Sequence, residues 1–322
     1  MKLACLSFTR FGETLAQKIS QGVEDEVHCF SADTYKDQLN RIMEEFDGIV
    51  FISSTGIAVR MIAPHLTSKT TDPAVVVIDD TAKFAVSLVS GHIGGANELT
   101  RKLADLLGCQ AVITTASDNR GIEAVDLFAH RHHLVIEDLN AVKQITAMMV
   151  DGKRIGFYSP CRETIDYPNL VKNHPEGCIF VDIAEKIDCS TPYCLLRPRV
   201  LHIGIGCRHG KPTDQIMAAI EEVFKAHNLS LKAVRSIATI DLKANEHGIR
   251  QACNLLDCEL NVYPIEQIKS IETHFDQSDF VKEITGVGAV AEPCACLAGG
   301  KVIVPKQIID GITIAVSQSA YP

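Results

Sequence analysis

The sequence predicts a multi-domain α/β protein, with an N-terminal parallel-sheet α/β domain, a small middle domain and a C-terminal α/β domain. The chain has 322 residues, enough for two or three domains. In its first and last thirds, short apolar runs alternate with segments whose apolar residues recur every three or four positions. Between them this periodicity weakens, and prolines stand at positions 160, 168, 175, 192 and 198. We therefore expect domains over residues 1–126, 127–199 (with a linker) and 200–322.

The same periodicities predict the individual elements. In the first domain we expect strands over residues 2–8, 47–53, 74–79, 83–89 and 109–114, and helices over 13–20, 35–46, 57–63 and 97–107. In the last domain we expect strands over 200–206, 233–240, 259–263, 302–305 and 312–318. The helices expected there cover 212–226, with Pro212 as first helical residue, then 247–256, 280–284 and 289–298.

Composition excludes several classes of protein. Hydrophobic residues make up 46% and charged residues 22%, as in ordinary globular proteins, and no apolar run is long enough to span a bilayer. The net charge of −9 has the wrong sign for a protein that binds nucleic acid through its phosphates. The 12 cysteines are scattered without a Cys-x-x-Cys pair, which favours reduced thiols in the cytoplasm and indicates no protein-bound metal.

The first loop with chemical potential covers residues 53–60. An apolar strand runs into Ser54, Thr55 and Gly56, and the helix that follows carries Arg60. Backbone N–H groups at a helix start, with hydroxyl donors beside them, can bind an anion. The alternative is an ordinary helix cap followed by a surface arginine.

The second loop covers residues 90–100 and is rich in glycine. Gly91, Gly94 and Gly95 permit backbone conformations and close ligand approach that a Cβ would block. The polar side chains at this turn belong to His92, Asn97 and Glu98. A possible base and a glycine-rich turn that could bind a ligand are thus placed together. The alternative is a tight turn with a structural histidine. The motif is neither a Walker A loop nor a dinucleotide fingerprint.

The third loop covers residues 114–121 and contains Asp118 and Arg120. All three loops follow predicted strands, and ligands of open α/β sheets bind outside the carboxyl ends of the strands. We therefore expect the three loops to converge on one crevice.

In the last domain, Cys207, Arg208 and His209 follow a strand and precede a helix. Glycines and basic groups in this place suit a carboxylate or a phosphate, but the spacing G-x-G-x-x-x-G does not match the fingerprint of nicotinamide cofactors. Cys207 could have thiolate character and act as a nucleophile, or simply be a buried cysteine.

A further loop before a helix contains Thr285, Gly286 and Gly288, with Glu292 in the first helical turn. Glu292 either contributes to binding or caps the helix, where its charge suits the helix dipole.

Taken together, five segments resemble the CbiG family of cobalamin biosynthesis, the cobalt-precorrin-5A hydrolases of the anaerobic corrin pathway. They are residues 48–60, 89–99, 115–118, 204–208 and 285–292, and the resemblance covers essentially the whole chain. His209 stands where Lys is usual in the family, and Ala289 where Ser is common.

The resemblance implies a substrate that is a cobalt-containing methylated tetrapyrrole with a δ-lactone. Water opens the lactone, and C20 leaves with its methyl group as acetaldehyde to give cobalt-precorrin-5B. The cobalt belongs to the substrate, so no cofactor is expected. We hypothesise that His92 is the general base, that Glu98 or Asp118 orients it, and that the N–H groups of Gly94 and Gly95 stabilise the oxyanion. The remaining residues singled out above would bind the carboxylates of the substrate.

Two alternatives remain open from the sequence. The protein could be a non-catalytic tetrapyrrole carrier, in which the same loops only hold carboxylates. It could also be an enzyme that uses a nucleotide, since glycine-rich loops at helix starts suit phosphates. We expect no nucleic-acid or membrane partner, and the sequence leaves open whether the chain forms a homodimer.

Overall fold

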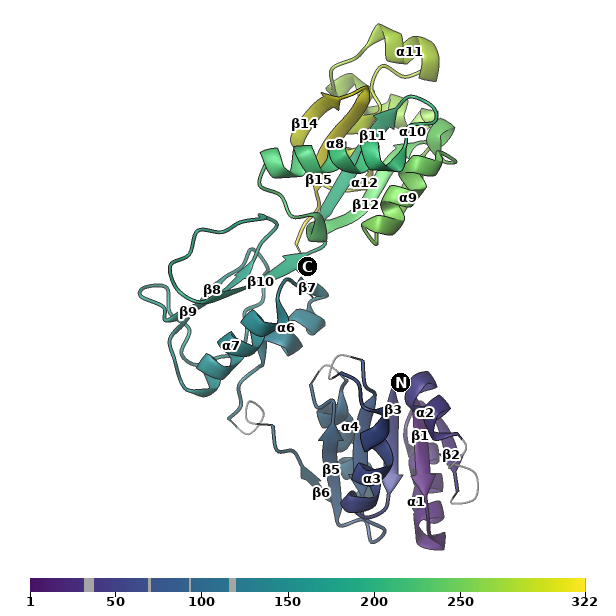
Figure 1. Ribbon diagram of the computed structural model, residues 1–322, viewed down its shortest axis with the longest axis vertical. Coiled ribbons are helices and arrows are strands. Elements are labelled where there is room, and N and C mark those ends of the chain that lie inside the picture. The colour runs from purple at the N-terminus through teal and green to yellow at the C-terminus, as the bar shows by residue number, and fades with distance from the viewer. Residues whose placement is uncertain (32–37, 69–70, 93, 116–119, 322) are drawn as a thin grey trace. The chain divides into compact units, whose positions relative to one another are not determined.

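The computed structural model describes residues 1–31, 38–68, 71–92, 94–115 and 120–321 (Figure 1). The chain forms two compact units. The first contains residues 1–130 with 166–168, and the second contains residues 131–165 with 169–322.

The first unit is built on a six-stranded sheet with the order β2-β1-β3-β4-β5-β6. Its strands are β1 (Lys2–Ser7), β2 (Glu26–Phe30), β3 (Gly48–Ile52), β4 (Ala74–Ile78), β5 (Phe84–Val89) and β6 (Gln110–Val112). Its helices are α1 (Arg10–Gly22), α2 (Leu39–Glu45), α3 (Thr55–Ile62), the 3₁₀ turn η1 (Ala63–His65), α4 (Ala96–Leu107) and α6 (Val125–Arg131), whose last residue belongs to the second unit.

The direction of the strands corrects the prediction of a purely parallel sheet. Strands β2, β1, β3 and β4 are parallel, but β5 pairs with β4 in the antiparallel sense, with Val75 opposite Val89 and Ile78 opposite Ala85. Strand β6 is parallel to β5. The carboxyl ends of β5 and β6 therefore lie at the opposite edge of the sheet from those of β1, β3 and β4.

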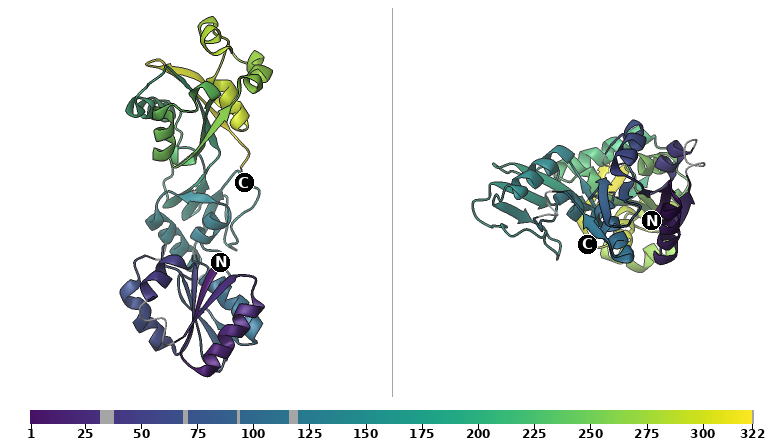
Figure 2. Two further views of the ribbon diagram at one scale, coloured as in Figure 1. Left: turned by 90° about the vertical axis from the view of Figure 1, so that its right-hand side faces the viewer. Right: turned by 90° about the horizontal axis from the view of Figure 1, so that it is seen from below.

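Helices cover both faces of this sheet (Figure 2). Apolar residues of α1 and α4, among them Ile19 and Leu103, pack on one face, and those of α2 and α3, among them Ile42 and Ile62, pack on the other. The central strands are buried on both sides, which explains their continuous runs of β-branched residues.

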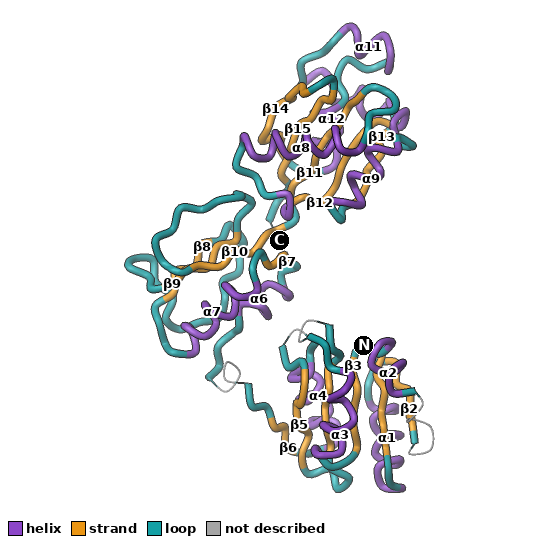
Figure 3. The backbone as a smooth tube through the Cα atoms, in the orientation of Figure 1, coloured by secondary structure: helices purple, strands orange, loops and turns teal. Residues whose placement is uncertain are grey.

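The second unit begins with a four-stranded sheet of order β7-β10-β9-β8. It consists of β7 (Leu134–Ile136), β8 (Ile155–Tyr158), β9 (Gly177–Val181) and β10 (Tyr193–Pro198), with helix α7 (Leu139–Val150) after β7. Long loops join β8 to β9 and β9 to β10 (Figure 3).

The unit continues with a five-stranded sheet of order β13-β12-β11-β15-β14. Its strands are β11 (Leu201–Cys207), β12 (Val234–Ile240), β13 (Glu259–Tyr263), β14 (Lys301–Ile309) and β15 (Ile312–Gln318). Its helices are α8 (Thr213–Ala226), α9 (His247–Leu255), α10 (Ile265–Ile271), α11 (Asp279–Thr285) and α12 (Ala291–Ala298), with the 3₁₀ turns η2 (Leu231–Ala233), η3 (Asp241–Lys243) and η4 (Glu272–His274).

Helix α12 packs directly on β11 because position 204 is a glycine. A Cβ at Gly204 would lie 1.8 Å from the carbonyl oxygen of Ala291 and 2.7 Å from the amide nitrogen of Ala295. No side chain fits there, so the glycine of this strand serves strand–helix packing.

Glu137 pairs with a buried arginine of the four-stranded sheet and with a lysine just before the five-stranded sheet's β12. Arg197, 1% exposed, donates from Nε to Glu137 (2.8 Å) and from its other nitrogens to carbonyl oxygens of the segment that follows β9. Glu137 also accepts from Lys232 (2.6 Å), which lies just before β12. The four-stranded and five-stranded sheets are thus fixed to one another.

The predicted α/β class is confirmed. The strands expected at 259–263 and 312–318 have the predicted bounds, and Pro212 caps α8 instead of opening it. Elements absent from the prediction include the half-exposed edge strand β2, helix α10 and most of residues 125–198. Among the described residues, the structure has no helix of the length and apolar character needed to cross a membrane.

Candidate functional site

The glycine-rich turn after β5 brings a histidine and a carboxylate together. His92 Nδ1 lies 3.9 Å from Asp126 Oδ1, and the two side chains are only 17% and 10% exposed. Asp126 is in the first turn of α6. A partly buried imidazole facing a carboxylate is the arrangement that orients a general base.

Glycines allow the tight path of this turn. A Cβ at Gly94 would lie 2.4 Å from Cβ of Ser90, and one at Gly91 would lie 2.9 Å from Oδ1 of Asn97. Gly95 has φ +82° and caps α4 from the left-handed region. Larger residues at these positions would move His92 relative to α4.

Asn97 connects two of the three predicted loops. Its Oδ1 accepts from Ser87 Oγ (2.6 Å), its Nδ2 donates to Thr115 Oγ1 (2.9 Å), and its backbone N–H donates to the carbonyl of Gly91 (3.0 Å). The loop after β6 therefore lies beside the His92 turn, as expected. Because Asn97 is buried, we interpret it as a residue that holds this turn in place.

The structure alters the roles expected at this turn. Glu98 is exposed on α4, and Asp126 is the acid beside His92. The N–H of Gly95 donates to the carbonyl of His92 (3.0 Å), so it is not available to an oxyanion here. Asp118 lies outside the described residues. Arg120 is the first described residue after that segment, and it is exposed.

The loop with Ser54, Thr55 and Gly56 does not join the other two. It follows β3, whose carboxyl end is at the opposite edge of the sheet from that of β5. Strands β3 and β4 are five residues long, so the two edges of the sheet are about 16 Å apart at 3.3 Å per residue. The expectation that three loops share one crevice is therefore wrong, because the β4–β5 hairpin reverses the strand direction.

At its own edge this loop forms an exposed cluster. Ser54, Thr55 and Gly56 are exposed, and a Cβ at Gly56 would lie 4.0 Å from Nη1 of Arg60, so the guanidinium is near the start of α3. Strands β1 and β3 both end at this edge, and the order of strands in the sheet changes direction between them. In doubly wound sheets, ligands usually bind at this point.

In the second unit, the loop after β11 binds a carboxylate that belongs to the chain itself. The buried Glu246 accepts from His209 Nδ1 (2.7 Å), from the N–H of Gly210 (3.0 Å) and from Lys243 Nζ (2.8 Å). Arg208 and the ring of His209 are exposed. The anion that the sequence predicts for this loop is thus supplied internally.

The titration of this cluster follows from its geometry. Burial alone would raise the pKa of Glu246, but the hydrogen bonds from Lys243, Gly210 and His209 outweigh it and lower the pKa to about 2. Burial raises the pKa of Cys207 despite the nearby Lys243. Cys207 is therefore a protonated thiol at neutral pH, which argues against a nucleophilic role.

The loop before α12 lies at the same edge as the Cys207 loop, since Val290 is 3.8 Å from where a Cβ of Gly206 would be. Its polar groups bind one another. Thr285 Oγ1 donates to the carbonyl of Val281 (2.8 Å), and the N–H of Gly288 donates to Glu272 (2.6 Å). Gly286, with φ +79°, ends α11. Glu292 accepts from the N–H of Lys306 (3.2 Å), so this loop is built mainly for packing.

Sequence reasoning missed Asp126, Lys243 and Glu246. Asp126 is 34 positions from His92, and Glu246 is 37 from His209, so no local motif contains them. The reversal of β5 did leave a signal, because the five residues between β4 and β5 are too few for a parallel crossover. In the described part of the chain, no group of three His, Cys, Asp or Glu side chains is placed to hold a metal ion.

These features define a multi-domain α/β protein with a His–carboxylate pair at a glycine-rich turn. Family models of cobalamin synthesis G match the chain along its length: the N-terminal model at residues 37–118, the central region at 123–198 and the C-terminal model at 201–317. The chain belongs to this CbiG family of cobalamin biosynthesis proteins.

Two relatives at 33–34% identity support the same assignment. A cobalt-precorrin-5A hydrolase from Priestia megaterium is 34% identical over 94% of this chain and 87% of its own length. One from Salmonella typhimurium is 33% identical over 84% of this chain and 81% of its own. A solved cobalamin biosynthesis protein G homologue from Sulfolobus solfataricus aligns over 100% of this chain and 97% of its own, with 22% identity and a TM-score of 0.44.

Proposed function

We propose that this protein is an enzyme that opens the δ-lactone of cobalt-precorrin-5A and releases C20 with its methyl group as acetaldehyde, giving cobalt-precorrin-5B. Two relatives that match most of the chain carry the name cobalt-precorrin-5A hydrolase. The observation that supports the site is the His92–Asp126 pair at the glycine-rich turn.

Lactone opening needs a base for the attacking water and a donor for the oxyanion. With Nδ1 of His92 turned toward Asp126, Nε2 would take the proton of the water. Asp126 is placed to orient the ring. Gly94 remains our candidate for the oxyanion N–H, and Asn97 holds the turn.

Water opens the lactone and frees a hydroxyl on C20; that hydroxyl then loses its proton, the bond from C20 to the macrocycle breaks, and the macrocycle carbon takes up a proton as acetaldehyde leaves. The substrate brings its own cobalt and these steps need no oxidant or reductant, so we propose no protein-bound cofactor. Each unit has exposed basic groups of its own that suit a carboxylate: Arg120 in the first unit, and Arg208 and His209 in the second. Ser54, Thr55, Gly56 and Arg60 lie at the opposite edge of the first sheet, and we leave them out of the reaction site. All 12 cysteines are free thiols, in keeping with the cytoplasmic location that we propose.

The test is anaerobic incubation with cobalt-precorrin-5A, followed by acetaldehyde trapping and mass analysis of the corrinoid. Release of acetaldehyde with conversion of the corrinoid is the expected result. Substrate that binds and stays unchanged would instead identify a tetrapyrrole carrier.

Variants of the two acids show which one orients His92. Asp126→Asn should lower turnover about tenfold or more, as loss of an orienting carboxylate does. Glu98→Gln makes the same chemical change at an exposed position of α4 and should keep turnover within about twofold. Equal effects of the two variants would remove Asp126 from its role.

A further inference from the structure

A cavity of about 660 Å³ lies within the second unit, at the amino ends of the strands of its last sheet. Arg199 precedes β11, Arg235 is the second residue of β12, and Glu259 is the first residue of β13; all three line the cavity. The Cys207 loop is at the other end of β11, seven residues or about 20 Å away. The volume is in the range of small-molecule sites.

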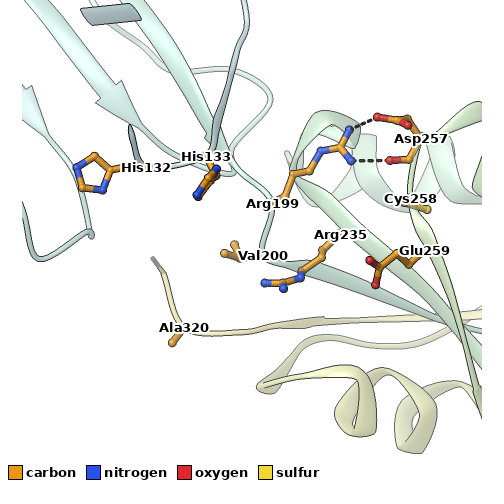
Figure 4. Close-up of a pocket in the computed structure, with 9 residues that line it drawn as sticks. All are labelled: His132, His133, Arg199, Val200, Arg235, Asp257, Cys258, Glu259 and Ala320. Carbon is orange, nitrogen blue, oxygen red and sulfur yellow. Dashed lines mark hydrogen bonds and ion pairs between the residues drawn. The ribbon is translucent and has the colours of Figure 1, made fainter. Parts of the chain in front are cut away.

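The charged residues that line the cavity are two arginines, Arg199 and Arg235, and two carboxylates, Asp257 and Glu259. Arg235 is an exposed residue in a strand whose other residues are all buried. Within the described chain no carboxylate lies within ion-pair distance of Arg235, whereas Arg199 is neutralised by Asp257 (3.0 Å). Figure 4 shows the Arg235 guanidinium pointing into the open space, away from Glu259.

A neighbouring group responds to this charge. His202 is buried on β11, and burial together with the charge of Arg235 lowers its pKa.

The walls of the cavity are fixed by the fold. Val200 is held by hydrogen bonds from its N–H to Ala233 (3.1 Å) and from Ser319 to its carbonyl (2.9 Å). The Lys232–Glu137 ion pair links the four-stranded sheet, which contributes the turn at His133, to the segment before β12 of the five-stranded sheet. The cavity thus places apolar Val200 and Ala320 beside one guanidinium (Figure 4).

We propose that this cavity is a binding site for an organic carboxylate, with Arg235 as its cationic partner. The guanidinium matches a carboxylate, and the apolar wall suits the carbon frame that carries it. The source of the carboxylate rests on the proposed function: it is an acetate or propionate arm of the tetrapyrrole, unless a small free acid binds instead. The site itself does not depend on turnover.

Cys258 provides a local readout, because it lines the same cavity and is partly exposed. Its alkylation by iodoacetamide in the full chain can be followed by peptide mass spectrometry. The probes are uroporphyrin, an octacarboxylate tetrapyrrole, and tricarballylate, a small tricarboxylate. We expect uroporphyrin to slow alkylation of Cys258, and slowing by tricarballylate at similar concentration would identify a small-acid site.

Arg235→Gln should raise the uroporphyrin concentration needed for half-protection about tenfold, the usual loss for one charge-assisted hydrogen bond. Lys225→Gln removes an equal charge from an exposed position of α8 and should leave protection unchanged. No protection by either probe, or full protection in Arg235→Gln, would overturn the proposal. Because the readout is alkylation of Cys258 and not turnover of cobalt-precorrin-5A, this outcome is separate from success or failure of the hydrolase assay.

Discussion

The two large sheets differ in where the loops after their strands lie. In the last sheet, β11, β12 and β13 run in one direction, so the segments after them meet at one edge, where Glu246 binds His209 and Gly210. In the first sheet, the β4–β5 hairpin sends the His92 turn and the Ser54 loop to opposite edges. Loops that follow strands become neighbours only when those strands share a direction.

The largest effect is expected where helix α12 packs on the last sheet. Gly204→Ala places a methyl group 1.8 Å from a backbone oxygen of α12, and a backbone cannot move aside as a side chain can. The free energy of unfolding should fall by about 3 kcal/mol or more in urea denaturation. In the first unit, a methyl group added by Gly56→Ala would have only Arg60 near it, at 4.0 Å. This variant should change the free energy of unfolding by about 0.5 kcal/mol or less. Similar losses at both positions would contradict this contrast.

The next prediction separates the two edges of the first sheet. His92→Ala should lower turnover of cobalt-precorrin-5A by about 100-fold with little change in substrate binding, because the general base is lost. Arg60→Gln, at the opposite edge, should stay within about threefold of the unmodified protein. Steady-state acetaldehyde release measures both, and the reverse order of effects would move the reaction to the Ser54 edge.

The buried carboxylate of the last sheet should show in the pH dependence of stability. A pKa lowered from 4.5 to about 2 means that Glu246 stabilises the fold above pH 4.5 and that this contribution is lost as pH falls toward 2. Glu246→Gln should therefore cost about 2–3 kcal/mol at pH 7 and less at pH 3. Urea denaturation at the two pH values tests this, with the exposed Glu222→Gln as control. A cost that does not depend on pH would rule out the charge as its cause.

The smallest effect concerns the glycine turn itself. Gly95 has φ +82° with open space around its Cβ position, so Gly95→Ala should cost about 1 kcal/mol from backbone conformation alone. Thermal unfolding measures this loss. A much larger cost would mean that the turn resists any change of backbone, and no cost would mean that it readily adopts another conformation.

Much of the fold could be predicted because buried strands and amphipathic helices leave clear periodicities, as in β13, β15 and α4. Residues 26–30 and most of the middle region left weaker signals, since edge strands are half-exposed and the loops there are long. His92, Asn97 and the Cys207 loop could be named as candidates because glycines stand beside them in sequence. Their carboxylate partners, Asp126 and Glu246, could not, because tertiary structure alone brings them close.

The internal carboxylate of the last sheet also limits what this loop can bind. Glu246 is tethered, so its local concentration beside His209 and Gly210 exceeds the concentration that a small metabolite reaches in solution. A free acid would have to displace it and leave its charge buried, which is costly. An incoming carboxylate would therefore meet the loop from outside, at the exposed side chains of Arg208 and His209.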